Sequence, residues 1–298
     1  MNKDLLTLND LTRDDLEKIF EFSTKLKQER GKVSYTPLAG KSIGLIFAKS
    51  STRTRVSFEV GVSELGGTAL YLDQGKMQSG RGETVADTAN VLSRYLHGIV
   101  IRTFSQADIE ELARVATIPV INALTDDYHP CQIVADLLTI KEYSGKVDSS
   151  VRVAFYGDGK SNIANSLILA AKLTGIELVI SSPEAVGINE HVAAGAPNVI
   201  WEKDPIKAAE GVDYFYTDVW VSMGFEEERE ERMKIFRPYQ VCSKLFDYAK
   251  KDAKFLHCLP AHRGEEVAAD VMDSARSIVF DEAENRLHVQ KAIMSMLF

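Results

Sequence analysis

One short segment combines three hydroxyl side chains with two guanidiniums: Ser51, Thr52, Arg53, Thr54 and Arg55. It follows a strand-like apolar run and begins a stretch with helical periodicity. A helix start offers unpaired N–H groups and the positive end of the helix dipole, and arginine forks match phosphate oxygens. Arg53 and Arg55 should also repel each other unless an anion lies between them. The segment therefore predicts an anion site; the alternative is a hydroxyl-capped helix with two solvated arginines.

Further polar side chains follow other strand-like runs. They are Arg102 and Thr103 after 98–102, His129 and Gln132 after 119–122, Asp218 to Gly224 after 214–217, and Cys258 to Glu266 after 255–257. In doubly wound sheets, ligands bind at the carboxyl ends of the strands. We therefore expect these groups to form binding sites.

Strand-like and helix-period segments alternate along the chain, which is typical of parallel sheets wrapped by helices. The expected strands are 42–48, 68–72, 98–102, 119–122, 151–156, 177–181, 199–201, 214–216, 255–257 and 278–280. A helix is expected over 85–95, and another begins at Pro130 and runs to about Tyr143. The predicted fold class is α/β, with two doubly wound parallel-sheet domains joined by interdomain helices.

Length and composition bound the class of protein. The 298 residues suit two α/β domains, and the net charge of −8 argues against a nucleic-acid binder. Three cysteines without CxxC spacing, no signal peptide and no apolar run of about 20 residues indicate a cytoplasmic protein. The charge run Glu226–Arg232 is interpreted as a solvated helix face.

The loop Gly157-Asp158-Gly159-Lys160-Ser161 follows a predicted strand and could be mistaken for a nucleotide-binding loop. A phosphate-binding P-loop needs a glycine five residues before Gly159, where Ala154 stands. A dinucleotide-binding turn needs a third glycine at the position of Asn162. The loop therefore matches neither the P-loop nor the dinucleotide-binding turn.

The segment around Cys258 could also suggest a zinc site or a cysteine nucleophile. His257, Cys258 and His262 could suggest zinc, but structural zinc sites usually use paired cysteines, and adjacent residues of an extended segment point to opposite faces. A cysteine nucleophile would need a histidine partner, which the sequence does not locate. Adventitious metal binding at Cys258 stays open.

The motifs together resemble the carbamoyltransferases, and within them the ornithine carbamoyltransferase branch. The resemblance runs from about residue 4 to the end of the chain. It rests on Ser51-Thr52-Arg53-Thr54-Arg55, Gly80-Arg81-Gly82-Glu83-Thr84, His129-Pro130-Cys131-Gln132, Asp218-Val219-Trp220-Val221-Ser222-Met223-Gly224, His257-Cys258-Leu259-Pro260 and Glu284-Asn285-Arg286-Leu287-His288.

The resemblance implies roles for residues on the carbamoyl phosphate side. The phosphate would be held by Ser51, Thr52, Arg53 and Thr54. Arg102 would reach a bridging or carbonyl oxygen, His129 and Gln132 would hold the carbamoyl group, and Arg286 would lie near carbamoyl phosphate. His129 is interpreted as a donor to the carbonyl, because fixed donors stabilise the oxyanion that develops there.

The resemblance also implies roles on the ornithine side. Asn162 would bind the α-carboxylate, although Ser161 stands where the family commonly has a first asparagine. The α-amino end would contact Asp218, Ser222 and the backbone of Met223, while Cys258 and the Leu259 carbonyl would lie near the δ-amine. Gln78 resembles a residue that the family inserts into a neighbouring subunit's site. The catalytic residues would be Arg53, Arg102, His129, Gln132 and Cys258.

The implied activity is transfer of the carbamoyl group from carbamoyl phosphate to L-ornithine, as in arginine biosynthesis, with no cofactor or metal. Residues 1–135 would bind carbamoyl phosphate and 136–298 ornithine, with a C-terminal helix at about 282–298 packing back on the first domain. The resemblance implies a homotrimer or a larger assembly of trimers, and no nucleic-acid or membrane partner.

Two other functions could use some of the same residues. A two-domain binding protein could clamp a phosphorylated amino compound, but it would not need the carbonyl-directed Arg102, His129 and Gln132. A carbamoyltransferase could instead use aspartate, putrescine or acetylornithine. Asp218 argues against aspartate, because its carboxylate would repel the second carboxylate of that substrate.

Overall fold

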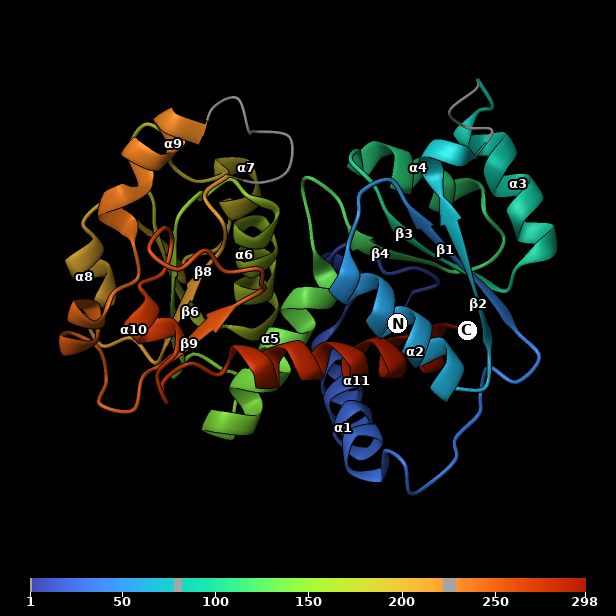
Figure 1. Ribbon diagram of the computed structural model, residues 1–298, viewed down its shortest axis with the longest axis horizontal. Coiled ribbons are helices and arrows are strands. Elements are labelled where there is room, and N and C mark those ends of the chain that lie inside the picture. The colour runs from blue at the N-terminus through green and yellow to red at the C-terminus, as the bar shows by residue number, and fades with distance from the viewer. Residues whose placement is uncertain (1, 78–81, 222–228) are drawn as a thin grey trace. The chain divides into compact units, whose positions relative to one another are not determined.

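The computed structural model describes residues 2–77, 82–221 and 229–298. The chain divides into two compact units, one formed by Met1–Ala135 with Glu284–Phe298 and the other by Asp136–Ala283. Each unit contains one parallel β-sheet with helices on both faces (Figure 1). The chain passes from unit to unit within α5 (Pro130–Ser144) and within α11 (Val279–Leu297). The prediction of two doubly wound α/β domains is confirmed.

The first unit holds a four-stranded sheet in the order β2-β1-β3-β4, with all neighbouring strands parallel. Besides parts of α5 and α11, its elements are η1 (Leu8–Asp10), α1 (Arg13–Glu29), β1 (Ser42–Phe47), α2 (Thr52–Glu64), β2 (Thr68–Asp73), η2 (Gln74–Lys76), α3 (Val85–Tyr95), β3 (Gly98–Arg102), α4 (Gln106–Val115) and β4 (Val120–Leu124). The helices α3 and α4 lie on one face of this sheet and α2 on the other (Figure 1).

Hydroxyl side chains determine where the helices of this unit begin. Ser51, Thr84 and Ser105 cap α2, α3 and α4 by accepting a hydrogen bond from a backbone N–H in the first turn. Between the sheet and α3 and α4, the core is formed by buried aliphatic side chains, among them Ile99, Ile101 and Leu112. Because both faces of the sheet are covered, β1 and β3 are buried along almost their whole length.

The second unit holds a five-stranded parallel sheet in the order β7-β6-β5-β8-β9. Its remaining elements are β5 (Arg152–Tyr156), α6 (Asn162–Thr174), β6 (Glu177–Ser181), α7 (Glu190–Ala193), β7 (Val199–Glu202), α8 (Pro205–Ala209), β8 (Tyr214–Thr217), α9 (Arg229–Phe236), η5 (Arg237–Tyr239), η6 (Ser243–Asp247), β9 (Lys254–His257) and α10 (Ala269–Met272). One core cluster joins the sheet to α8, η6 and α10 around Phe215 and Phe255.

The strand order of each sheet reverses once. In the first unit the chain leaves β1 for β2 on one side and later returns to β3 on the other. In the second unit it leaves β5 for β6 and β7, and later returns to β8. At such a reversal the connections leave in opposite directions, so a crevice opens between the carboxyl ends of the two strands. By this rule we expect the crevices between β1 and β3 and between β5 and β8.

Nine of the ten strand predictions are confirmed, and the tenth is wrong. Residues 278–280 do not form a strand, because α11 begins at Val279. Ile278 still donates its N–H to the carbonyl of Phe255 at 3.0 Å as an extended residue does, and the helix follows at once. Periodicity cannot separate a three-residue apolar run from the start of a buried helix, whereas Asp281 and Glu282 suit a first turn.

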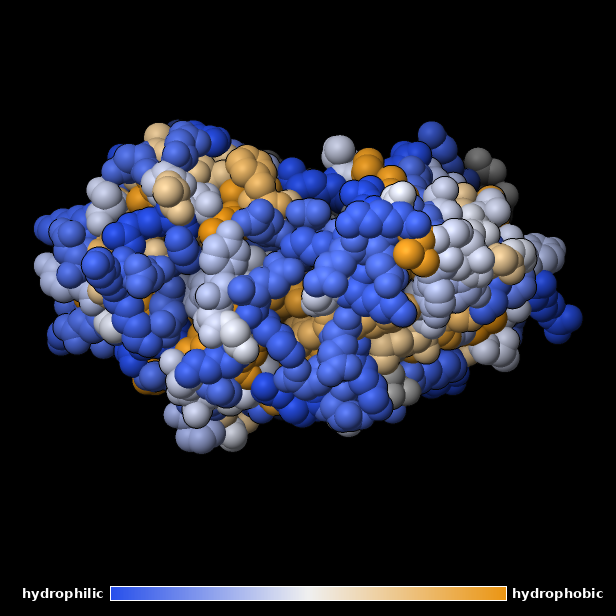
Figure 2. Space-filling view, turned by 90° about the horizontal axis from the view of Figure 1, so that it is seen from below, coloured by the Kyte–Doolittle hydropathy of each residue, from blue (hydrophilic) through white to orange (hydrophobic). Residues whose placement is uncertain are grey.

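No helix in the described ranges is long and apolar enough to span a membrane. Hydrophilic residues cover most of the face shown in Figure 2, and hydrophobic residues form separate groups among them.

Gly159 provides a test of the fold near the second crevice. A Cβ atom there would lie 2.3 Å from the backbone oxygen of Gly187, so Gly159→Ala must push two backbone segments apart. We expect a loss of about 1–3 kcal/mol in the free energy of unfolding, measured by denaturant titration. Gly75→Ala is the matched control, because its Cβ would meet only the Asp73 carboxylate at 3.4 Å. Equal stability of both variants would contradict this account.

Candidate functional site

The segment Ser51 to Arg55, predicted to bind an anion, follows β1 in the first unit, next to the end of β3. The Ser51 hydroxyl accepts the N–H of Thr54 at 3.3 Å and so begins α2, while Thr52 and Arg53 are exposed. Thr54 is buried, and its hydroxyl accepts a hydrogen bond from Nη2 of Arg286 at 2.8 Å. Arg286 therefore joins this helix start from α11, more than 200 residues further along the chain.

Arg55 does not contribute to the anion site. Its Nε atom donates to Glu59 Oε1 at 2.8 Å, and its guanidinium lies 3.7 Å from the centre of the Tyr71 ring. The repulsion argued for Arg53 and Arg55 is thus wrong, because Arg55 already has a carboxylate partner one turn along the same helix. The case for an anion site rests on the helix start, Arg53 and Arg286.

His129, Arg102 and Gln132 are also in the first unit, and all three are buried. Arg102 ends β3, while His129 and Gln132 lie at the start of α5, which follows the adjacent strand β4. Burial holds the pKa of His129 well below its ordinary value, and the positive charges of Arg286 and Arg102 act in the same direction. His129 is therefore neutral at neutral pH, and a neutral imidazole can donate one hydrogen bond without adding charge.

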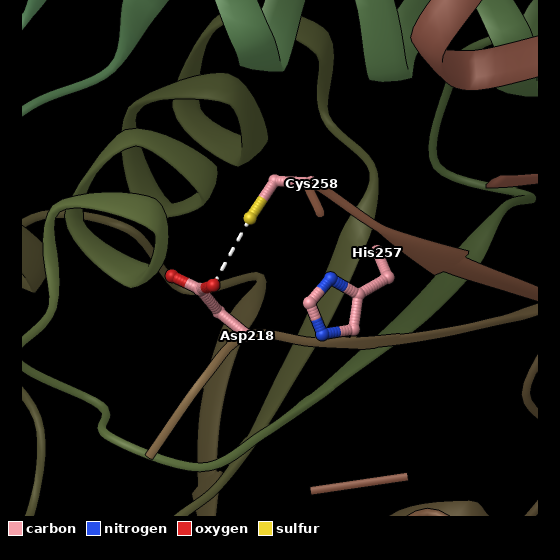
Figure 3. Close-up of side chains that lie close together, drawn as sticks. All are labelled: Asp218, His257 and Cys258. Atoms are coloured by element: carbon pink, nitrogen blue, oxygen red, sulfur yellow. Dashed lines mark hydrogen bonds between the residues drawn. The ribbon is translucent and has the colours of Figure 1, made fainter. Parts of the chain in front are cut away.

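At the crevice of the second unit, a carboxylate meets a thiol. Cys258 follows β9 directly, and its thiol donates a hydrogen bond to Asp218 Oδ1 at 3.0 Å. Figure 3 shows this bond and the neighbouring His257. The same oxygen accepts the N–H of Val219 at 2.7 Å. Burial raises the pKa of the Asp218 carboxyl, and it also raises the pKa of Cys258 well above its ordinary value, with Asp218 adding to the second effect.

This geometry decides against a nucleophilic thiolate. Cys258 donates to a carboxylate, which stabilises the thiol form, and both ring nitrogens of the neighbouring His257 have other partners. His257 Nδ1 accepts the N–H of Leu259 at 2.9 Å, so Nε2 carries the proton and donates to Glu266 Oε1 at 3.1 Å. The donor atoms of Asp218, His257 and Cys258 lie close enough together for a metal ion, but the imidazole is already committed to these two bonds.

The sequence did not predict three buried groups near the end of β9: Glu282, Tyr216 and Asp136. Glu282 Oε2 accepts the N–H of His257 at 2.8 Å, and its Oε1 lies 3.5 Å from the Tyr216 hydroxyl. That hydroxyl donates to Asp136 Oδ2 at 3.0 Å. The only sequence signal was the presence of carboxylates inside apolar helical segments, which is unusual for an unpaired group. These side chains fix the end of the strand that carries Cys258.

The loop between β5 and α6 follows the strand that pairs with β8 at this reversal of strand order. Ser161 caps α6, because its hydroxyl accepts the N–H of Ala164 at 3.2 Å, and Asn162 is the first residue of the helix. Arg232 on α9 donates to Asp158 Oδ2 at 2.5 Å and to the carbonyl of Trp220 at 2.6 Å. Of the charge run Glu226–Arg232, residues 226–228 lie outside the described ranges, and Arg229, Glu230 and Glu231 are exposed. The prediction of a solvated face is wrong for Arg232, whose partners Asp158 and Trp220 no local pattern reveals.

The predicted site residues thus separate into two groups. The structure brings Ser51, Thr52, Arg53, Thr54, Arg102, His129, Gln132 and Arg286 to the first unit and Asn162, Asp218, Cys258 and Leu259 to the second. Gln78, Ser222 and Met223 lie outside the described residues. The first group offers cations and neutral donors suited to a phosphate and a carbonyl. The second offers a carboxylate suited to an ammonium group.

Comparison with known proteins gives two family models that together match almost the whole chain. Residues 3–142 match the carbamoyl-P binding domain of aspartate/ornithine carbamoyltransferase, and residues 149–297 match its Asp/Orn binding domain. An ornithine carbamoyltransferase of Syntrophus aciditrophicus is 53% identical, over 100% of both chains. One of Oceanobacillus iheyensis is 51% identical, over 99% of this chain and 94% of the relative.

Solved structures show the same likeness. The ornithine carbamoyltransferase of Pyrococcus furiosus superposes with a TM-score of 0.93 at 48% identity, covering 99% of this chain and 96% of the other. That of Burkholderia thailandensis gives a TM-score of 0.92 at 40% identity, covering 99% and 98%.

The protonation state of Cys258 can be tested by alkylation. At pH 8 iodoacetamide should modify Cys258 slowly, because its raised pKa leaves little thiolate. Asp218→Asn removes the charge that opposes ionisation, so the pKa should fall and modification, followed by peptide mass mapping, should become several-fold faster. Cys131 is the internal control: burial raises its pKa to about 12, and its rate should stay low in both proteins. Equal rates at Cys258 would refute the thiol–carboxylate pair.

Proposed function

This chain belongs to the aspartate/ornithine carbamoyltransferase family, and we propose that it transfers the carbamoyl group of carbamoyl phosphate to the δ-amine of L-ornithine, releasing L-citrulline and phosphate. The observation that carries the choice of ornithine is the Asp218 carboxylate at the second crevice, hydrogen-bonded to Cys258. A carboxylate there attracts the α-ammonium of ornithine, whereas it repels the second carboxylate of aspartate.

On the donor side, the phosphate is held by the start of α2. The hydroxyls of Ser51, Thr52 and Thr54 and the guanidinium of Arg53 supply hydrogen bonds and charge, and the backbone N–H groups of the first helical turn add to them. The bond from Arg286 to Thr54 supports this assignment, because it gives the phosphate end a second, buried cation. Both cations stabilise the phosphate as it leaves with an additional negative charge.

The carbamoyl group is held by Arg102, His129 and Gln132. When the amine attacks, the carbonyl oxygen becomes an oxyanion, and donors already fixed in place stabilise it without reorganising. The lowered pKa of His129 supports a role as a neutral hydrogen-bond donor, because a group that stays unprotonated cannot act as a general acid. The C–N bond then forms, the C–O bond to phosphate breaks, and the proton lost by the amine ends on the phosphate.

On the acceptor side, ornithine is bound by its two ends. Asn162 meets the α-carboxylate, an assignment supported by the use of Ser161 as the cap of α6. Asp218, with Ser222 and the backbone of Met223, binds the α-ammonium group. Cys258 and the carbonyl of Leu259 lie near the δ-amine. That amine has a reference pKa of about 10.4, as in lysine, so it must lose a proton before it attacks.

The assembly and setting of the enzyme are part of the same proposal. Residues 1–135 bind carbamoyl phosphate and residues 136–298 bind ornithine, with the C-terminal helix returning to the first domain; the two compact units support this division. The enzyme forms a homotrimer or an assembly of trimers, with Gln78 reaching a neighbouring subunit's site. It acts in the cytoplasm, in arginine biosynthesis. These assignments rest on the family likeness.

A side-by-side assay tests the substrate. We expect rapid citrulline formation with L-ornithine and carbamoyl phosphate, and little product with putrescine, acetylornithine or aspartate. Asp218→Asn should raise the KM for ornithine by roughly tenfold to hundredfold, since a charge-assisted bond contributes about 1.5–3 kcal/mol, and should leave carbamoyl phosphate binding almost unchanged. Preference of the native enzyme for another amine would reject the proposal, and equal losses for both substrates would reject the role of Asp218.

Two neighbouring arginines test the donor side. Arg53→Ala should lower kcat/KM for carbamoyl phosphate by roughly tenfold to hundredfold for each charge-assisted bond lost. Arg55→Ala is the matched control: it removes the same charge two residues away, but from a side chain engaged with Glu59 and Tyr71, and its kinetics should stay within about threefold of native. Similar defects in both variants would mean that general charge, and not a bond to phosphate, is responsible.

A further inference from the structure

A second cluster of possible metal ligands lies in the turn between β9 and α10, and nothing in the proposed reaction uses it. The turn is closed by hydrogen bonds from Glu265 N to the carbonyl of His262 at 2.9 Å and from Gly264 N to the carbonyl of Val267 at 2.8 Å. It brings His262 Nδ1 to 3.7 Å from Glu265 Oε2 and 3.9 Å from Glu266 Oε2. The three ligand atoms lie within 4.8 Å of one another.

Glu266 is the unusual member of this cluster. It is fully buried, and its Oε1 accepts hydrogen bonds from His257 Nε2 at 3.1 Å and from the backbone N–H of His262. Its Oε2 is buried too, and no group in the described ranges donates a hydrogen bond to it. A buried carboxylate oxygen without a donor is costly, so an incoming cation would satisfy it.

The carboxylate of Glu265 is held in a similar way. Its Oε1 is paired with the guanidinium of Arg229, and its backbone carbonyl accepts a hydrogen bond from Gln240 Nε2 at 2.7 Å. Each carboxylate is thus fixed through Oε1 and turns Oε2 toward His262. Such outer contacts orient metal ligands and are typical of metal sites. The carboxylates of Glu265 and Glu266 and the guanidinium of Arg229 together carry a charge of −1, while the nearby Arg237 is bound to the carbonyl of Gly264 at 2.8 Å.

We propose that His262, Glu265 and Glu266 bind a divalent metal ion of the zinc class. One imidazole nitrogen and two carboxylate oxygens suit Zn²⁺, Co²⁺ or Mn²⁺, with water completing the coordination. Bonds of about 2.0–2.2 Å in a tetrahedral zinc site separate the ligand atoms by about 3.4 Å. The distances of 3.7 and 3.9 Å from His262 Nδ1 to the two carboxylate oxygens need a contraction of a few tenths of an ångström, and all three ligand atoms lie within 4.8 Å of one another. The side chain of His262 is 46% exposed, so an ion can enter from solvent.

The site is separate from the residues assigned to the reaction, but it is connected to them. Glu266 holds His257 through Oε1, and His257 in turn holds the backbone of Leu259, next to Cys258. A metal on Oε2 would therefore tighten the segment 257–266 without taking part in carbamoyl transfer. Its expected effect is higher stability of the second unit, since a ligand that binds only the folded state raises the unfolding temperature.

The experiment uses the full-length native protein after removal of metal with a chelator. We expect calorimetric titration with Zn²⁺ to give one site per chain, and Zn²⁺ to raise the unfolding temperature. His262→Asn and Glu265→Gln should each weaken binding by at least tenfold and remove the thermal shift. Both side chains are partly exposed, so these variants should fold. His191→Asn removes an exposed histidine elsewhere in the same unit and should bind like the native protein.

Titration of the native protein and of the Cys258→Ser variant with Co²⁺ separates this site from the cluster of Asp218, His257 and Cys258. We expect d–d bands of cobalt without a thiolate charge-transfer band, and unchanged binding in Cys258→Ser. A thiolate band that disappears in this variant would assign the metal to the cluster at the ornithine end and overturn the proposal. Absence of binding up to about 1 mM Zn²⁺, or binding that His262→Asn and Glu265→Gln leave unchanged, would overturn it as well.

Discussion

The reversal of strand order within each parallel sheet is the constraint on which the rest of the structure depends. Parallel strands need crossover connections, and where two successive connections leave in opposite directions, no helix covers the carboxyl ends between them. In the first unit this opening lies between β1 and β3, and in the second between β5 and β8. One topological rule, applied twice, thus provides a place for each of two substrates.

Burial then gives the two places opposite electrostatic character. At the first, Arg286 reaches Thr54, while burial and nearby guanidiniums keep His129 neutral. At the second, burial and the charge of Asp218 keep Cys258 as a thiol. The first set of groups suits a phosphoryl anion with a polarised carbonyl, and the second suits an ammonium. The same desolvation that would be costly for unpaired groups therefore sets the protonation states of His129 and Cys258.

The second unit holds its crevice with a layer of buried carboxylates. Glu282 bonds the backbone of His257, Glu266 bonds its ring, and Asp136 accepts the hydroxyl of Tyr216. These groups anchor the strand end that precedes Cys258 and Leu259. In Glu266 one oxygen does this anchoring while the other turns toward His262 and Glu265, which links the inferred metal site to the same layer.

The sequence by itself determined the local parts of this protein. Alternating periodicity located nine of the strands, because it depends on neighbours a few residues apart, and the prediction of an anion site at Ser51 to Thr54 rests on equally short spacing. Only the tertiary structure decided that Arg286 joins Thr54, that Arg55 turns instead to Glu59 and Tyr71, and that residues 278–280 begin a helix. Such partners are chosen by packing, which brings together groups that no sequence spacing relates.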